Sequence, residues 1–389
     1  MESPPAPAPA PAPESPPADV SPPTTAPPSV VTVTAEPTPS DDDVWSMRLG
    51  GYLQSQFRVR QNSSAPVDED GFRLARVRLT STAQGRVGNL TLSAFIEAEL
   101  QPTFTLTDAQ ATVSSKLDNH GLIAFDLGQT RVPISRQQLM SDSRLSFVDK
   151  AQLASIAPDR DLGARLTFVP PGLRMLRVMT GVFNGDGKNQ IQNINEGYLF
   201  AGRIEVTPLG TAPYAESAFG EPWVSAAVSA GYNDLTPGNY EEKQTSLGAD
   251  LSGAYHGFSA SVEYLLVKHA FEGDPANLPG PDYNANGWMA QVAYLLPVEL
   301  PPSRKTRIEI GARVEEIDRN DTVPIPQLAD PAQSVREYTG VISAYLREHL
   351  LKAQLAFSHF QEVETETSTG TDATYANDQV LLQVTYRVE

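Results

Sequence analysis

The hydrophobic and polar residues of this chain alternate with a period of two over long runs. In the first run, residues 45–60, odd positions carry Trp45, Leu49, Leu53 and Phe57, and even positions carry mainly arginine and glutamine. A period of two is the pattern of a β-strand. The run is longer than the ~5–6 residues of an ordinary strand and reaches the ~9–11 residues that a tilted membrane-crossing strand requires. It therefore predicts one wall strand of a transmembrane barrel.

Fifteen further runs of the same kind follow, which makes sixteen. They cover about 72–84, 90–100, 105–115, 121–130, 159–169, 173–183, 198–207, 222–232, 245–255, 257–268, 287–296, 305–316, 336–348, 350–361 and 378–388. An even number of strands is what a single antiparallel chain needs to close a barrel in the bacterial outer membrane. We expect an all-β fold, with residues 45–389 forming a transmembrane antiparallel β-barrel of about 16 strands.

The connections between these runs alternate in length. Connections after even-numbered runs are short, as at Gly85 to Asn89, and those after odd-numbered runs are long, as at 131–158. The exceptions are the short 101–104 and the long 208–221. Outer-membrane barrels have short periplasmic turns and longer external loops, so the alternation supports the barrel. A soluble all-β binding protein has no reason to show it.

Composition narrows the alternatives. The chain has 389 residues, no cysteine and a formal net charge of -18, which excludes disulfides and thiolate metal sites. The acidic excess lies mainly in residues 181–389, where we expect a solvated surface. No continuous basic face is visible, so a nucleic-acid partner is not expected.

Residues 1–40 are dominated by Pro, Ala, Ser and Thr. Such a segment lacks the apolar surface for a core and is expected to be a disordered periplasmic arm of polyproline character. It would serve as a tether or spacer. Binding to the cell wall or to another periplasmic partner is the alternative.

The first candidate functional residues are arginines on the polar faces of the first two runs: Arg48, Arg58, Arg60, Arg76 and Arg78. If the barrel forms, these side chains point into the lumen, because a charge facing lipid costs about 2–4 kcal/mol near mid-membrane. They could attract anions. The structural alternative is a stiffening ladder of ion pairs with the acids on neighbouring runs, Glu97, Glu99, Asp108 and Asp126.

Enzymatic and metal-binding signals are weak. The five histidines are scattered, and the oxygen-rich stretches 184–188 and 318–321 do not complete a calcium loop. Turn chemistry accounts for both stretches. We expect no catalytic residues, no metal site, no cofactor and no enzymatic activity.

Several segments resemble the phosphate-selective porin O/P family of outer-membrane proteins. The resemblance runs from about Leu49 to the C-terminus and is most specific over residues 128–139, GQTRVPISRQQL, and residues 180–187, TGVFNGDG. Further similar segments are 141–150, 158–163, 199–203, 287–288 and 379–388.

This resemblance implies a sixteen-stranded porin, a homotrimer, whose third external loop folds back into the lumen. Here that loop is residues 131–158. It would bring Arg131, Arg136, Arg144 and Lys150 to the constriction, beside interspersed acids such as Asp142 and Asp149. The loop also carries apolar residues that would anchor it to the inner wall: Ile134, Leu139, Leu145, Phe147, Val148 and Leu153.

The expected function is that of a porin, surrounded by outer-membrane lipid, through which small anions such as phosphate diffuse passively. The alternative is a poorly conducting structural barrel that the Pro-rich arm tethers to a periplasmic partner. Conductance in a planar bilayer separates the two.

Overall fold

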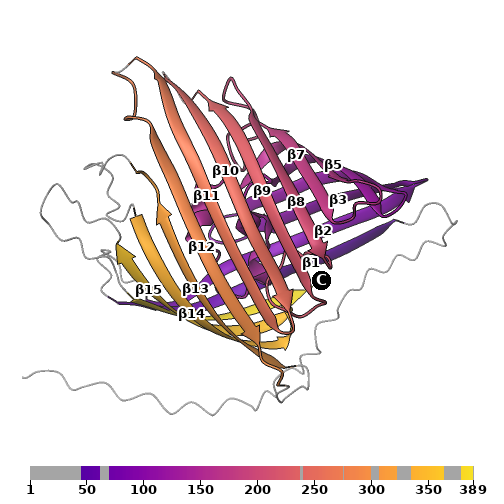
Figure 1. Cartoon of the computed structure of the whole chain (residues 1–389), viewed down its shortest axis with the longest axis vertical. Coiled ribbons are helices and arrows are strands. Elements are labelled where there is room, and N and C mark those ends of the chain that lie inside the picture. The colour runs from indigo at the N-terminus through magenta and orange to yellow at the C-terminus, as the bar shows by residue number, and fades with distance from the viewer. Residues whose placement is uncertain are drawn as a thin grey trace, which may run out of the picture. The chain divides into compact units, whose positions relative to one another are not determined.

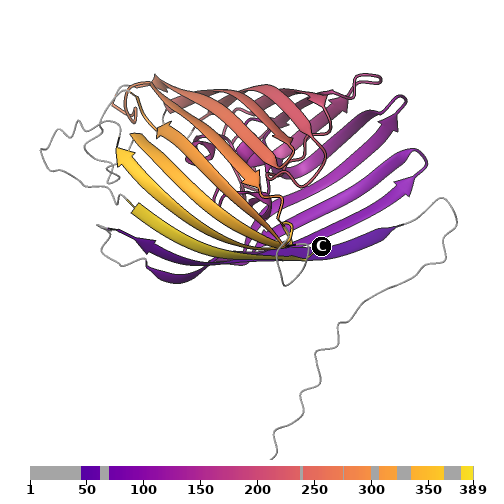
Figure 2. The same cartoon turned by 60° about the horizontal axis from the view of Figure 1, so that its bottom comes forward.

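The computed structural model describes residues 45–61, 70–236, 240–274, 276–298, 306–321, 334–362 and 378–388. These residues form a closed antiparallel barrel of sixteen strands (Figures 1 and 2). The predicted fold class is therefore confirmed. The prediction for residues 1–40 lies outside the described residues.

Each strand pairs with its neighbours in sequence, and β1 pairs with β16 to close the barrel through a register from Gly51↔Val388 to Arg60↔Gln379. The strands are β1 (Ser46–Arg60), β2 (Gly71–Val87), β3 (Leu90–Glu99), β4 (Thr105–Leu117), β5 (Gly121–Arg131), β6 (Arg160–Val169), β7 (Leu176–Phe183), β8 (Leu199–Leu209), β9 (Trp223–Leu235), β10 (Tyr240–Tyr255), β11 (Phe258–Gly273), β12 (Tyr283–Leu295), β13 (Arg307–Asp318), β14 (Ser334–Arg347), β15 (Leu351–Glu362) and β16 (Asp378–Val388). Between β5 and β6 lie α1 (Arg136–Leu139) and the 3-10 helices η1 (Asp142–Arg144) and η2 (Gln152–Ile156).

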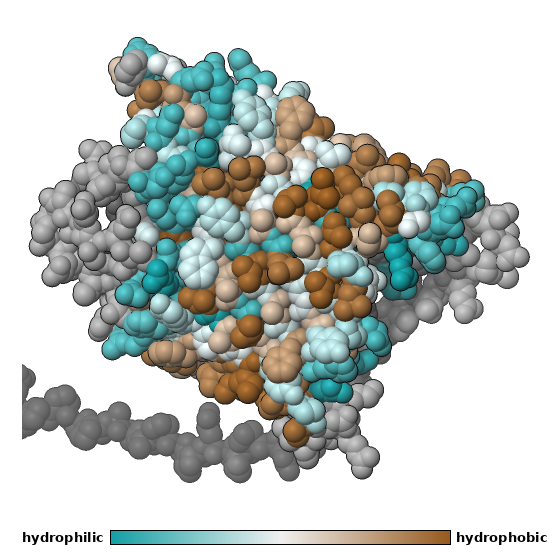
Figure 3. All heavy atoms as spheres, viewed as in Figure 1, coloured by the Kyte–Doolittle hydropathy of each residue, from teal (hydrophilic) through white to brown (hydrophobic). Residues whose placement is uncertain are grey.

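The outer face of the wall is apolar, as the alternation predicts. Leu53, Leu79 and Ile96, which lie on the apolar faces of the first three runs, are exposed, and Leu79 has 57% of its surface accessible. Phe57, Val77 and Leu92 are half-buried. Figure 3 shows apolar residues spread across the face formed by β8 to β12, with hydrophilic residues gathered at the upper rim. No helix among the described residues is long and apolar enough to cross a membrane.

Strands β10 and β11 are longer than the sequence pattern suggests. The pattern predicts a strand from 245, whereas β10 begins at Tyr240, and β11 continues to Gly273. At this end the β10–β11 hairpin is held by polar contacts, for example the 2.6 Å ion pair between Lys243 and Glu272. Polar pairing replaces the apolar alternation here, so the period-two signal ends before the strands do.

Candidate pore and constriction

The connection between β5 and β6, residues 132–159, lies inside the barrel; we call it the constriction loop. All six of its expected apolar anchors are buried, with Leu153 at 0% and Phe147 at 1% exposure. Leu153 and Ile134 belong to an apolar cluster with wall residues of β7, β8, β11 and β12, and Phe147 packs with residues of β14 to β16. Burial of this kind stabilises by about 1.5–3 kcal/mol per large side chain, so the loop is held as a packed element.

Wall carboxylates hold the loop backbone. The Glu263 carboxylate of β11 accepts the amides of Arg136 at 3.0 Å and Gln137 at 3.1 Å. Glu315 of β13 accepts the amide of Gln152. These acids satisfy donors that a buried loop would otherwise leave unpaired.

The loop's one α-helical turn begins at Ser135 for a local reason. The Ser135 hydroxyl accepts the Gln138 amide at 3.2 Å, which is the bond of a helix N-cap. The same hydroxyl donates to Glu263 at 2.6 Å. One serine therefore starts the helix and fixes it to the wall.

The opposite wall carries arginines. Arg78 of β2 contacts Glu97 at 2.9 Å and Glu99 at 2.7 Å on β3. It also reaches Asp142 of the loop at 3.0 Å. Arg76 contacts Asp142 at 3.5 Å and Asp149 at 3.2 Å. The pairs of Arg78 with Glu97 and Glu99 belong to the ion-pair ladder predicted as the structural alternative, and the contacts with Asp142 and Asp149 extend this ladder from the wall onto the loop.

The ladder continues at the strand ends on either side of the loop. Arg131 lies 3.9 Å from Asp108, and its guanidinium donates to the Leu139 carbonyl at 2.5 Å. Arg160 binds Asp108 at 3.1 Å. Arginines and carboxylates are thus paired along the β2–β6 part of the wall at this level.

Charges on the loop are strongly perturbed by this network. Burial favours the neutral acid at Asp142, but Arg76, Lys150 and Arg78 outweigh it and hold the pKa of Asp142 far below its ordinary value. Burial lowers the pKa of the Lys150 ammonium to about 8, although Asp142 opposes the shift. Asp142 is therefore charged at neutral pH, and Lys150 loses its charge just above neutral pH.

Two recesses flank the loop at the barrel end that bears the long connections. The basic recess, of about 270 Å³, is lined by Arg58, Arg60, Arg73, Lys150 and Arg313, and by the acids Asp149 and Glu337. The other recess, of about 470 Å³, mixes Asp159 and Asp161 with Arg160 and Arg319. It also holds His269, whose ring stacks on Tyr283 at 4.3 Å. Among the described lining residues, the two recesses thus differ in their charge balance.

The sequence-predicted site residues separate into groups. Arg58, Arg60 and Lys150 line the basic recess, whereas Arg76, Arg78 and Arg131 belong to the ladder. Arg144 is half-buried in η1, and Arg48 is exposed near the other end of β1. Arg144 and Arg48 therefore belong neither to the lining of the basic recess nor to the ladder as described.

Arg136 differs from the expectation that it faces the pore. Only 2% of its surface is exposed, and its guanidinium donates to the Pro213 carbonyl at 2.8 Å. It also lies over the Trp223 ring at 5.1 Å. Buried in this way, Arg136 is an anchor of the loop, because a lumen-lining charge must reach water.

Sequence reasoning missed Arg73 and Arg313. The β1–β2 register shifts between Gln54 and Ser55, and Arg73 beyond this bulge donates to Gln56 at 2.7 Å on the inner side. A bulge changes which residues share a face, so strict alternation from Arg76 cannot find Arg73. Arg313 lies on the polar face of β13, where the period of two does indicate a side chain that points into the barrel.

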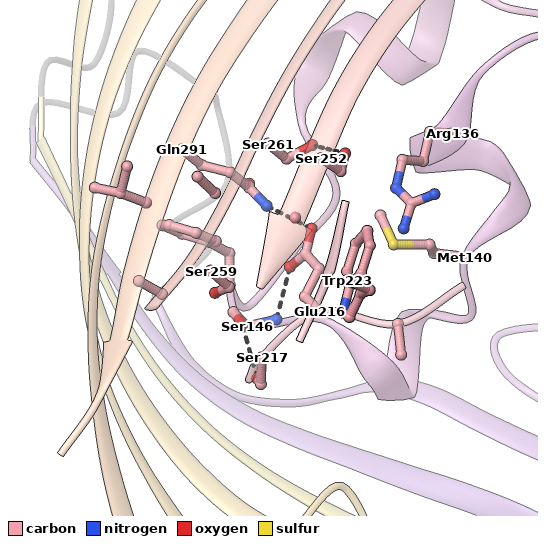
Figure 4. A pocket seen from close by; sticks show the side chains of 16 residues that line it. Arg136, Met140, Ser146, Glu216, Ser217, Trp223, Ser252, Ser259, Ser261 and Gln291 are labelled. Carbon is pink, nitrogen blue, oxygen red and sulfur yellow. Dashed lines mark hydrogen bonds between the residues drawn. The ribbon is translucent and has the colours of Figure 1, made fainter. Parts of the chain in front are cut away.

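The connection between β8 and β9, residues 210–222, also reaches the constriction loop; we call it the inner turn. Its Glu216 and Ser217 lie beside Ser146 in a small pocket lined by loop and wall residues (Figure 4). This is the connection predicted at 208–221, which is long although it follows an even-numbered run. Among the described residues, no group of three or more His, Asp or Glu side chains is placed to hold a metal ion.

Neither protein-family models nor curated protein sequences match the chain. Solved structures do. The outer-membrane channel DcaP of Acinetobacter baumannii is 13% identical with a TM-score of 0.57, and the alignment covers 88% of this chain and 97% of that one. OmpF of Salmonella typhi, solved with daunomycin, is 10% identical (TM-score 0.54), with coverage of 88% and 97%. OmpT of Vibrio cholerae, solved in a trimer form, is 11% identical (TM-score 0.55), with coverage of 88% and 99%. The chain therefore has the fold of these outer-membrane proteins. This fold, together with the apolar outer face of the wall, supports the expected location in the bacterial outer membrane.

Proposed function

We propose that the protein is an outer-membrane porin that passes small anions through a lumen narrowed by the constriction loop. The observation that carries the proposal is the basic recess, which is lined by five basic side chains and two acids. In a recess with low-dielectric walls, such an excess raises the local concentration of anions and lowers their entry cost.

Phosphate is the substrate we favour within this class. The resemblance to the phosphate-selective porin O/P family supports it, and guanidinium groups match the oxygens of phosphate in paired hydrogen bonds. A homotrimer is the proposed assembly, supported by the trimer form of Vibrio cholerae OmpT. The Pro-rich arm is proposed to extend into the periplasm, where it could reach a cell-wall or protein partner.

One observation favours the second candidate, a structural barrel that conducts poorly. The ion pairs from Arg78 to Glu97 and Asp142 join wall to loop, and these three side chains are at most 10% exposed. Such pairs leave little room for solute at that level. If the protein is such a structural barrel, the ladder closes the lumen, and the Pro-rich arm tethers the barrel to a periplasmic partner.

Planar-bilayer recording of the purified full chain separates the candidates. We expect single channels in chloride whose reversal potential in a salt gradient shows anion preference, and partial block of the chloride current by phosphate. The double variant Arg60→Ala with Arg73→Ala should lose part of this preference. Arg174→Ala, an exposed arginine in the β6–β7 turn, is the matched control and should behave as the parent. Absence of channels would favour the structural barrel, and cation preference would overturn anion transport.

A further inference from the structure

The inner turn enters the barrel from the end that carries the short connections. It begins at Gly210, where φ is +67° and an added Cβ would lie 2.2 Å from the Pro222 carbonyl oxygen. Glycine is required at such a conformation and close approach. The two ends of the turn are thus pinched together, and the residues between them are directed toward the constriction loop.

Glu216 is the centre of the contact between the two segments. Its carboxylate accepts the Ser146 amide at 2.7 Å and the Gln137 side-chain amide at 3.1 Å, both from the loop. The Gln291 side chain of β12 donates to it at 2.6 Å. Its backbone amide donates to the Arg144 carbonyl at 2.9 Å. Figure 4 shows Glu216 lying between the loop and the wall.

Ser217 adds a second set of hydrogen bonds, and its own backbone is strained. Its φ is +76°, which a non-glycine residue rarely adopts. Its hydroxyl lies 2.8 Å from the Ser146 hydroxyl and 2.9 Å from the Tyr345 hydroxyl of β14. An unfavourable backbone conformation persists only where surrounding contacts fix it, and here those contacts are the loop and the far wall.

The inner turn is also fixed from the β14–β15 turn. His349 Nε2 lies 2.9 Å from the Glu216 carbonyl oxygen. Burial, followed by the Lys352 charge, lowers the pKa of His349 to about 3, so the ring is neutral and its Nε2–H donates this bond. Phe219 packs edge-on against Tyr345 with ring centroids 4.8 Å apart. The turn therefore has its own rigid support.

We infer that the inner turn is a brace that positions the constriction loop, and that Glu216 is the positioning residue that transmits its hold. The inference rests on the proposed channel function and adds a determinant of its pore size outside the loop itself. Without Glu216, the Ser146 amide and the Gln137 side chain lose their acceptor, and the segment around Phe147 moves in the lumen.

Glu216→Ala is the first test. We expect a single-channel conductance about twofold above that of the parent, with more current noise, because a freed loop obstructs less and fluctuates more. Glu221→Ala changes an exposed acid of the same connection and is the matched control. A nitroxide on Ser141, a half-buried loop residue, should become more mobile in Glu216→Ala and stay immobile in the control.

A reversible crosslink gives the decisive test, because the chain has no cysteine of its own. Cysteines at Ser146 and Ser217, whose hydroxyl oxygens are 2.8 Å apart, can form a disulfide that replaces the hold of Glu216. In the Glu216→Ala background, oxidation should restore parental conductance and immobilise the nitroxide, and reduction should reverse both. The control pair is Ser252 and Ser261, 2.7 Å apart on neighbouring wall strands, whose crosslink should restore neither.

The outcomes are separable from those of the proposed function. If the parent forms no channel, that function fails, and the nitroxide alone decides whether the brace exists. If the parent conducts but Glu216→Ala leaves conductance, noise and nitroxide mobility unchanged, the brace is overturned. Restoration by both crosslinks would also overturn it, because general stiffening of the barrel would then be the cause.

Discussion

The two sides of the lumen use charge in different ways. On the β2–β6 side, carboxylates such as Glu97 and Asp108 are paired with arginine side chains. On the β11–β14 side, the Glu263 and Glu315 carboxylates accept backbone amides of the constriction loop. Most of the paired carboxylates on the β2–β6 side are buried, but Asp149, the loop partner of a β2 arginine, keeps 39% of its side chain exposed. The β11–β14 side hides its charges under the loop.

This difference separates selectivity from support. A charge acts strongly on a passing ion when little water or counter-charge screens it, so the basic recess, where bases outnumber acids, should set ion preference. A buried carboxylate that satisfies backbone donors should set where the loop lies. The acidic excess of the second half, expected to be a solvated surface, therefore includes residues that build the constriction from behind.

The largest loss in free energy of unfolding is expected from Glu263→Ala. This change leaves the Ser135 hydroxyl and the amides of Arg136 and Gln137 without their acceptor. Unsatisfied buried donors cost about 1–3 kcal/mol each, and partial resolvation should hold the loss in free energy of unfolding to about 2–4 kcal/mol. Urea titration in detergent measures it. Glu241→Ala, an exposed acid of β10, should change little, and equal losses in the two variants would contradict the supporting role.

Arg78→Ala should lower the free energy of unfolding less than Glu263→Ala does, and it should change the ion preference more. It removes the partner of Glu97, Glu99 and Asp142, but these acids border a lumen that can rehydrate them. We expect the free energy of unfolding to fall by about 1–2 kcal/mol, less than the about 3–5 kcal/mol for a fully buried pair that loses one partner, and the reversal potential to be displaced toward cations. A double-mutant cycle with Glu97→Ala isolates the pair. A larger stability loss than in Glu263→Ala, with unchanged ion preference, would reverse the assignment of the two sides.

The sequence predicts the barrel well because a wall strand obeys a single constraint. Lipid on one side and a wet lumen on the other impose a period of two, and each of the sixteen strands lies where a run of this period predicts one. Where the constraint ends, prediction fails. The outer ends of β10 and β11 lie beyond the apolar pattern, and the bulge near Gln54 moves Arg73 onto the lumen face.

The candidate site is less predictable because residue type does not reveal burial inside the lumen. Arg136 and Arg131 look alike in sequence, yet Arg136 is packed against Trp223 and Arg131 joins the ladder. The inner turn did leave a signal, since 208–221 is long where a short turn is expected. Length alone, however, gives neither its inward direction nor the role of Glu216.

The smallest expected effect comes from Lys150, where the two uses of charge meet. Its ammonium lines the basic recess but also lies 3.1 Å from Gln138 of the loop. Because burial lowers its pKa to about 8, the side chain is charged below that pH and loses its charge as the pH rises through it. The parent's anion preference should therefore fall by a few millivolts of reversal potential between about pH 6.5 and about pH 9.5.

Two variants assign this change to Lys150. Lys150→Arg keeps its charge over the whole range and should abolish the pH dependence. Lys150→Met should show the lower preference at both pH values. If the parent is insensitive to pH over this interval, or if Lys150→Arg retains the full dependence, the recess charge that titrates is not Lys150. Ion preference would then rest on the permanently charged arginines alone.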